Sequence, residues 1–415
     1  MEGQGLPDGV QLLLPAAHAV LPSTFERHAF KEGILNTRST HGLIIPCRAS
    51  PFVASHASFL KVLGPAPSVK VIATGEAGFA HEAGVWVDKT EEVWFTSNLR
   101  KDPTTAEASV NISKLHVPSG QVTEVTIELA KRGNGACPYG DYILFCEQGC
   151  GPGLPSSLVA VNPLDPLDAF VVLNNFHGRA FNSLNDAIVL PPPLTRVRNQ
   201  QPTIRGANVT PNGSSCHAAT PGSTIWFTDP PYGFEQGFRD PCQLPPQVYV
   251  FEPRSGAVRV VADGFEHPNG IAFSPDCSTC YITDTSHIHG SGRLDPTLQS
   301  TIYAYDVIWP SEDELDVDVA GPSLRNRRVF AFADSGVPDG IKCDTQGNVY
   351  AGCGDGIHVW NKHGTLIGRI VIGLADGNVG AGCANFCFIP GGRLVCFSED
   401  RIYLVDGLAV EGALL

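Results

Sequence analysis

A short unit of two β-strands joined by a tight turn recurs along this chain, and it constrains the fold more than any other feature. In its clearest copy, residues 266–285, the pair Asn269-Gly270 opens an alternating run, Ile271–Phe273. A turn signal at 274–276 separates this run from a second one rich in β-formers, residues 281–283. We therefore expect each copy to form an antiparallel hairpin.

The unit occurs six times, and the other five copies begin near residues 83, 137, 185, 340 and 383. A sheet of about four strands repeated in this way cannot bury both of its faces alone, so neighbouring units must pack against each other. The sequence therefore predicts an all-β chain folded as a six-bladed β-propeller.

The copies also predict how the chain is divided. Residues 1–65 match no copy and are expected to form an irregular leader, whereas residues 66–415 are expected to form the propeller. A strand near Val71 should close the ring by pairing with the last blade, because both would otherwise leave unpaired edges. Long loop insertions are expected on one face, at residues 191–222, which we predict to be a lid, and at residues 285–299.

Charge and hydropathy narrow the class of partner. The net charge of −14 argues against nucleic acid, because phosphate binding depends on Lys and Arg. No segment approaches the run of about 20 apolar residues that a membrane-spanning helix requires. The expected partner is therefore a small-molecule substrate, while the sequence leaves the oligomeric state open.

The cysteines and the N-terminal segment bear on location. The 13 cysteines show no short disulfide framework, and most fall within strand patterns, which predicts free buried thiols in a reducing compartment. Residues 10–19 resemble a signal-peptide core, but no basic residue precedes them. Sequons at Asn111, Asn208 and Asn212 would fit secretion. A cytoplasmic location is predicted, with secretion as the alternative.

Four of the copies open with an oxygen-bearing side chain at an equivalent position: Glu82, Asn185, Asn269 and Asp339. Equivalent positions of a radial fold converge on its axis, so we expect these side chains to meet. Two carboxylates and two amides, without Cys or His, form a ligand set that suits Ca²⁺, with Mg²⁺ or Mn²⁺ as alternatives. For any one of them alone, the alternative is a turn residue.

Several motifs lie around these four residues. They are Pro268-Asn269-Gly270, Pro338-Asp339-Gly340, Asn182–Asp186, Phe227–Gly233, His81-Glu82-Ala83 and Trp94–Asn98. Together they resemble the senescence-marker-protein/gluconolactonase family, and the last two resemble its fungal lactonohydrolase branch. The resemblance covers roughly residues 75 to 410 and implies a six-bladed propeller, a divalent ion, usually Ca²⁺, on its axis, and hydrolysis of sugar lactones or related esters. By motif, the metal ligands of the family fall on the same four residues.

The sequence departs from the family pattern in two places. Gly84 stands where the family usually has proline. The insertion that follows Asn185 is longer than a plain turn, which indicates either a pocket for a larger substrate or drift in a loop.

The remaining candidates surround the predicted ion. Asp339 and Asn185 are predicted to be catalytic, with Asp339 as the general base and a rim histidine as the alternative base. The predicted substrate-binding residues are Arg179, Asp229, Tyr232, His81, His267, His287 and His289. For Asp229 the alternatives are orientation of Asn185 and a structural Asx-turn. For each histidine the alternative is a structural role.

These observations predict a metal-dependent lactone hydrolase, in which the ion polarises the carbonyl and a nearby water attacks it. No Gly-x-Ser-x-Gly motif is present, which argues against a serine hydrolase. The alternative is a natural-product cyclase of the hetero-Diels–Alder type, as in fungal secondary metabolism, which would use the same pocket without hydrolysis. A third functional hypothesis is a propeller that serves only as a binding platform.

Overall fold

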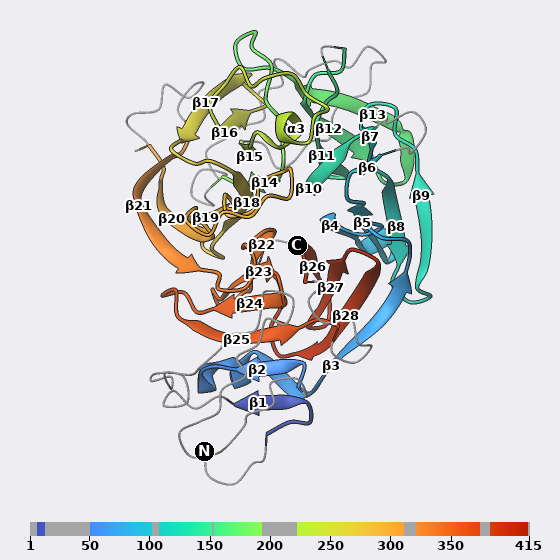
Figure 1. The fold of residues 1–415 in the computed structure, drawn as a ribbon, viewed down its shortest axis with the longest axis vertical. Helices are drawn as coiled ribbons and strands as arrows, with labels where there is room; N and C mark the ends of the chain where they lie inside the picture. The colour runs from blue at the N-terminus through green and yellow to red at the C-terminus, as the bar shows by residue number, and fades with distance from the viewer. Residues whose placement is uncertain are drawn as a thin grey trace.

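The chain forms six sheets arranged around a central axis (Figure 1). The structure is a computed structural model that describes residues 6–12, 50–101, 108–151, 153–192, 222–310, 321–373 and 382–413. Five sheets have four strands, and the sixth has six. The prediction of an all-β, six-bladed propeller is confirmed.

The first three blades follow the chain, each from its innermost to its outermost strand. They comprise β4 (Glu82–Val87), β5 (Glu92–Thr96), β8 (Ile112–His116) and β9 (Gln121–Val125); β10 (Gly133–Tyr139), β11 (Tyr142–Glu147), β12 (Ser157–Asn162) and β13 (Asp165–Leu173); and β14 (Ala187–Leu190), β15 (Thr224–Asp229), β16 (Gln247–Glu252) and β17 (Ala257–Ala262). A small hairpin, β6 (Arg100–Lys101) with β7 (Ala108–Ser109), interrupts the first blade.

The last three blades complete the ring. They comprise β18 (Pro268–Phe273), β19 (Thr279–Asp284), β20 (Thr301–Ile308) and β21 (Ser323–Phe332); β22 (Ile341–Cys343), β23 (Val349–Cys353), β24 (Gly356–Trp360) and β25 (Leu366–Val371); and β26 (Phe386–Ile389), β27 (Arg393–Ser398), β28 (Arg401–Leu408) and β3 (Leu63–Thr74). The described helices are short: α3 (Tyr232–Glu235), η3 (Ala57–Lys61) and η4 (Asp88–Thr90).

The clearest repeat folds as its pattern predicts. Ile271 pairs with Ile282, and Phe273 pairs with Cys280, so that β18 and β19 form the hairpin. The Asp276 carboxylate accepts hydrogen bonds from the Ser274 hydroxyl, at 2.6 Å, and from the Ser278 backbone N–H, at 3.1 Å. Short polar side chains that bond to their own backbone in this way stabilise a tight turn.

A strand from the N-terminal side closes the ring. β3 pairs antiparallel with β28, with Val71 opposite Tyr403 and Lys70 opposite Leu404. Figure 1 shows this blue strand beside the red strands of the last blade. The predicted closure is confirmed, and its physical reason is that it removes the two open edges that would otherwise remain.

The two long insertions leave opposite ends of their blades, so the prediction that they share one face is wrong. The insertion at 191–222 starts from Leu190, which pairs with Thr224 at the end of β14 away from Asn185. The insertion at 285–299 follows Asp284, which pairs with Pro268 beside Asn269. The sequence pattern shows where a strand ends, but not on which face of the propeller that end lies. Residues 193–221 themselves, predicted to be a lid, lie outside the described residues.

The predicted leader contributes strands where the structure describes it. β2 (Phe52–Ala54) pairs antiparallel with β25, and β1 (Val10–Leu12) pairs parallel with β2, which makes the fifth blade six-stranded. Residues 13–49, and with them most of the signal-like segment 10–19, lie outside the described residues.

The core consists of six apolar clusters, one between each pair of neighbouring blades. Each contains large aromatic side chains; the cluster between the first two blades, for example, holds Trp94 and Phe145. Because each blade buries its faces only against its neighbours, stability depends on the ring being complete.

Two further features of the described residues are the state of the cysteines and the length of the helices. Eleven cysteines in the described part of the chain are free thiols, as predicted; eight of them are buried, and seven of those eight lie within strands. No helix among the described residues has the length and apolarity that crossing a bilayer requires.

Candidate metal centre at the propeller axis

Each blade places one oxygen-bearing side chain at or just before the start of its innermost strand. In chain order these residues are Glu82, Asn134, Asn185, Asn269, Asp339 and Asn385. The structure therefore extends the predicted set of four to one residue per blade. The inner strands surround the axis (Figure 1), so residues far apart in sequence can approach one another there.

Glu82, Asp339 and Asn269 are brought together. One ligand atom each of His81, Glu82 and Asp339 lies within 4.8 Å of the others. The Asn269 side chain hydrogen-bonds to the Asp339 carboxylate. Burial, together with the Glu82 carboxylate, holds the pKa of Asp339 well above its ordinary value. Two adjacent carboxylates in such a place repel each other unless a cation or protons neutralise them.

Oxygen atoms left without partners test whether a cation fits. Asn185 Oδ1 and Asp339 Oδ1 are buried atoms with no hydrogen-bond partner. Buried polar atoms are normally paired, because leaving one unpaired costs about 1–3 kcal/mol. Both atoms belong to predicted ligands, and both are hard oxygens of the kind that Ca²⁺ prefers. The residues present therefore fit a divalent cation.

The backbone around Asn185 links it to the same group. The Asn185 N–H donates to the Thr228 carbonyl at 3.0 Å, and the Thr228 hydroxyl donates to the Asn269 carbonyl at 2.7 Å. Asn185 is 4% exposed. Thr228 thus joins the third and fourth blades by hydrogen bonds to the backbone of two predicted ligands, Asn185 and Asn269.

Asp229 positions the segment that carries Asn185. Its two oxygens accept backbone N–H bonds from Asn182, at 3.0 Å, and from Ser183, at 2.8 Å. Burial raises the pKa of Asp229 to about 7, although these two N–H groups oppose the shift. Of the roles predicted for Asp229, the geometry matches the orientation of the Asn185 loop rather than contact with substrate.

A β-bulge aims Glu82. The pairing of β4 with β5 shifts between Ala83 and Val85, and Gly84 has a φ of +104°. Proline, with φ near −65°, cannot adopt this conformation. The departure at Gly84 is therefore tied to a local bulge, and such bulges re-aim neighbouring side chains.

His81 lies beside this bulge. Its Nδ1 lies 2.6 Å from Glu399 Oε1. Burial alone would lower the pKa of His81, but the ion pair with Glu399 outweighs it and raises the pKa to about 10. The ion pair therefore favours the cationic form of His81 in the metal-free protein, which makes it a poor general base and a donor to an anionic group.

A second group of side chains lies beside Asn269 and is called the rim group below. It contains Tyr232, Glu235, His267 and His289. The Tyr232 hydroxyl hydrogen-bonds to the Thr285 hydroxyl and to the Asn269 side chain, and its ring lies 5.1 Å from that of His267. His267 Nε2 lies 2.9 Å from Glu235 Oε1. Tyr232 and His267 are thus part of one wall beside the axial residues.

The rim group offers metal-type ligands, and hydrogen bonds already engage them except at His267 Nδ1, a buried atom without a partner. Glu235, His267 and His289 each place a ligand atom within 4.8 Å of the others. Arg293 donates to His289 Nε2 at 2.6 Å, so Nδ1 carries the ring proton and points it toward Glu235 at 3.5 Å. A protonated nitrogen cannot bind a metal, so this arrangement is a hydrogen-bonded chain.

Two predicted substrate residues, His287 and Arg179, form no hydrogen bond or ion pair with these groups among the described residues. His287 Nδ1 hydrogen-bonds within its own loop, to the Asp295 carbonyl at 2.9 Å. Arg179 is exposed, and its backbone pairs with Phe176. Within the described part of the chain, no hydrogen bond or ion pair joins the Arg179 guanidinium to the axial group.

Sequence reasoning missed Asn134, Asn385 and Glu235. Asn134-Gly135 has the same form as Asn269-Gly270, so a signal existed, but the second copy of the repeat was placed a few residues too late. Asn385 lies within the copy that begins near residue 383 and directly precedes the first strand of the last blade, but it is followed by Phe386 and so lacks the Asn-Gly pattern. For Glu235 the sequence offers no periodic signal.

Comparison with known proteins bears directly on the family. The model of the SMP-30/Gluconolactonase/LRE-like region matches residues 197–289 and 297–393. The predicted family resemblance is confirmed. The match spans the third to the sixth blade, and therefore includes Asn269, Asp339 and Asn385.

Curated relatives extend the likeness toward the N-terminus. Lactonohydrolase oryL of Aspergillus oryzae is 28% identical over 341 residues, which cover 74% of this chain and 64% of that protein. Gluconolactonase of Zymomonas mobilis is 26% identical over 249 residues, which cover 58% of this chain and 55% of that protein. The chain thus spans less than two thirds of the length of both relatives.

Solved structures share the architecture. A gluconolactonase from Xanthomonas campestris matches with a TM-score of 0.59 and 22% identity, over 86% of this chain and 94% of that one. The calcium-binding protein regucalcin from Agrobacterium tumefaciens matches with a TM-score of 0.53 and 15% identity, over 83% and 95%. At these identities the likeness shows the fold.

Proposed function

We propose that this chain is a lactone hydrolase that depends on one divalent cation at the propeller axis, with Ca²⁺ as the first candidate. The observation that carries the proposal is the presence of two unpartnered buried oxygens on predicted ligands: Asn185 Oδ1, and Asp339 Oδ1 on the carboxylate beside Glu82 and Asn269. The names of the relatives, lactonohydrolase and gluconolactonase, and of the calcium-binding structural neighbour support the same reading.

Glu82, Asn185, Asn269 and Asp339 would hold the cation. When bound, a divalent cation supplies Lewis-acid polarisation of the lactone carbonyl. The residues of the chain then have separate tasks. The carboxylate oxygen of Asp339 that does not hold the cation would accept a proton from the water that attacks the carbonyl carbon, the ring C–O bond breaks, and that proton passes to the leaving alkoxide, which gives the hydroxy acid.

The surrounding residues hold the substrate. The Tyr232 hydroxyl, next to Asn269, is suited to the hydroxyls of a sugar lactone. The cationic His81 favours the negative charge that develops on the substrate. The cyclase alternative finds no support among the relatives and structures named above.

The proposal is tested by following acid release from a panel of sugar lactones, with and without chelator. Chelation should abolish turnover, and added Ca²⁺ should restore it. Asp339→Ala removes both a ligand and the base, so turnover should vanish even in excess Ca²⁺. Asn185→Ala removes a neutral ligand, so part of the turnover should return at high Ca²⁺, with Glu82→Gln between the two. Wild-type turnover by chelated protein or by Asp339→Ala would contradict the proposal.

A further inference from the structure

The first residue of the last blade occupies a place between the two carboxylate ligands. The ring order puts β26 beside β4 on one side and beside β22 on the other. Asn385, which directly precedes β26, is 1% exposed. It therefore lies between the blade that carries Glu82 and the blade that carries Asp339.

The orientation of the Asn385 side-chain amide follows from its partners. The Phe386 backbone N–H donates to Asn385 Oδ1 at 2.8 Å, and Lys342 Nζ donates to the same atom at 3.4 Å. Both partners are obligatory donors, so this atom must be the oxygen. The amide nitrogen then faces Glu82 and donates to its Oε2 at 2.8 Å.

The Asn385 amide is also wedged in place. A Cβ atom built on Gly340 would lie 2.2 Å from Asn385 Oδ1 and 2.3 Å from its Cγ. The amide thus packs directly on the backbone next to Asp339, where only glycine leaves enough room. Asn385 therefore contacts the Asp339 segment by packing and the Glu82 carboxylate by a hydrogen bond.

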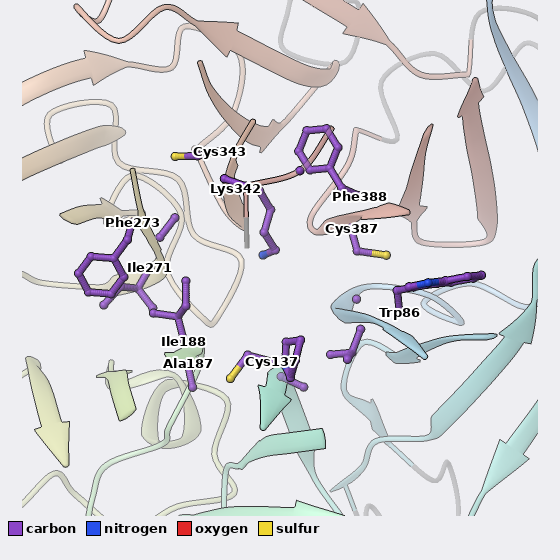
Figure 2. Close-up of a pocket in the computed structure, with 17 residues that line it drawn as sticks. Trp86, Cys137, Ala187, Ile188, Ile271, Phe273, Lys342, Cys343, Cys387 and Phe388 are labelled. Atoms are coloured by element: carbon purple, nitrogen blue, oxygen red, sulfur yellow. The ribbon is translucent and has the colours of Figure 1, made fainter. Parts of the chain in front are cut away.

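Lys342 stands behind this amide, on the side away from Glu82. Figure 2 shows its side chain extending into a pocket further along the inner strands, with its nitrogen between Ile271, Cys137 and Cys387. Its charge also reaches Asp186: burial raises the pKa of Asp186 to about 6, and Lys342 opposes that rise.

We propose that Asn385, anchored by Phe386 and Lys342, is a positioning residue that holds the Glu82 carboxylate in the orientation needed to bind the axial cation. This inference rests on the proposed function, because it concerns the same cation. With Oε2 occupied by the Asn385 amide, Oε1 of Glu82 is left to bind the cation. A partner that orients a metal ligand typically contributes 10- to about 100-fold to metal affinity.

The test measures cation binding itself. Asn385→Leu keeps the approximate volume but removes the N–H donor, and Asn385→Ala removes the donor without risk of overlap with Gly340. Isothermal titration with Ca²⁺ should show a Kd raised about 10- to 100-fold in both variants. Eu³⁺ bound in place of Ca²⁺ should gain about one coordinated water, as read from luminescence lifetimes in H₂O and D₂O, because Glu82 no longer holds its place among the ligands.

Asn348→Leu is the matched control. Asn348 Nδ2 also donates to a carboxylate, Asp344 Oδ2, at 2.7 Å, but at the other end of the fifth blade. Its loss should leave the Ca²⁺ affinity and the Eu³⁺ water number unchanged. An unchanged Kd and water number in both Asn385 variants would overturn this inference alone. Failure of the wild-type protein to bind either ion would overturn the proposed function together with it.

Discussion

Two aspartates in the fifth blade show how the same residue type takes opposite roles. Asp344 accepts backbone N–H bonds from Gln346 and Asn348, and hydroxyl and amide bonds from Tyr350 and Asn348, all at 2.7–2.9 Å. Asp339, five residues earlier, keeps a buried oxygen without a partner. A saturated carboxylate stabilises a turn, whereas an unsaturated one is available to a ligand.

This contrast predicts opposite effects of one substitution. Asp344→Asn places an amide N–H₂ against donors, so the free energy of unfolding should fall by about 2 kcal/mol while the Ca²⁺ affinity is unchanged. Burial and the Glu82 carboxylate both disfavour the charged form of Asp339. Asp339→Asn removes that charge, so the metal-free protein should gain stability and lose Ca²⁺ affinity. Urea unfolding and calorimetric titration measure both quantities. Loss of stability in metal-free Asp339→Asn would contradict the assignment of Asp339 as a ligand.

At the scale of elements, connections between strands hold the axial residues in place. The turn between β23 and β24 carries Asp355, which lies 2.7 Å from His358 Nε2 and 3.2 Å from Arg369 Nη1. Arg369 reaches on to Asp334, at 2.8 Å, in the segment that leads to Asp339. This buried network therefore ties β24 and β25 to the strand entry where a predicted ligand sits.

The network predicts a pH dependence of stability. Burial opposes the charged form of Asp355, but His358 and Arg369 outweigh it and lower the pKa to about 2. A depressed carboxyl pKa adds stability above its ordinary value near 4, and this stability is lost as the pH falls through about 2. Asp355→Asn should therefore be less stable by about 2 kcal/mol at pH 7, and the difference should shrink between about pH 4 and pH 2.

Urea midpoints measured across this pH range would test the prediction. Asp306→Asn serves as the control, because the Asp306–Arg328 pair at 2.8 Å is exposed and should contribute little. A difference for Asp355→Asn that stays constant down to pH 2 would show that its charge is not the source of the stability.

At the scale of the whole molecule, the ring depends on the pairing of β3 with β28. The apolar cluster between the sixth and first blades forms only if the last blade is complete, and β3 is its outermost strand. β1 and β2, in contrast, extend the fifth blade outward (Figure 1). The two parts of the N-terminal segment should therefore differ in importance.

Two truncations test this difference. Removal of residues 1–50 takes β1 but leaves β2 and β3, so the protein should remain monodisperse with a modestly lower Tm. Removal of residues 1–76 exposes the edge of β28, so the protein should aggregate or lose its cooperative unfolding transition. Gel filtration and thermal circular dichroism provide the measurements. Equal behaviour of the two truncations would contradict closure by β3.

The cation should act on the whole ring, because its four predicted ligands come from four blades. A ligand that binds only the folded state adds about 2.7 kcal/mol when present at 100 times its Kd. The Tm should therefore rise with the logarithm of the Ca²⁺ concentration and fall on chelation. In Glu82→Gln this rise should be weaker at each Ca²⁺ concentration, and a Tm indifferent to Ca²⁺ in the wild-type protein would argue against the site.

The repeating hairpins, the closing strand near Val71 and the opening residues Glu82, Asn269 and Asp339 could be predicted from the sequence, because they follow from local periodicity and turn chemistry. Which residues meet depends on how the ring closes in three dimensions. Asn385 and Glu82 are 303 positions apart and touch because the ring closes. The ends from which the insertions leave, and the Glu235–His267–His289 chain on the rim, likewise depend on where strands turn in space, which periodicity does not record.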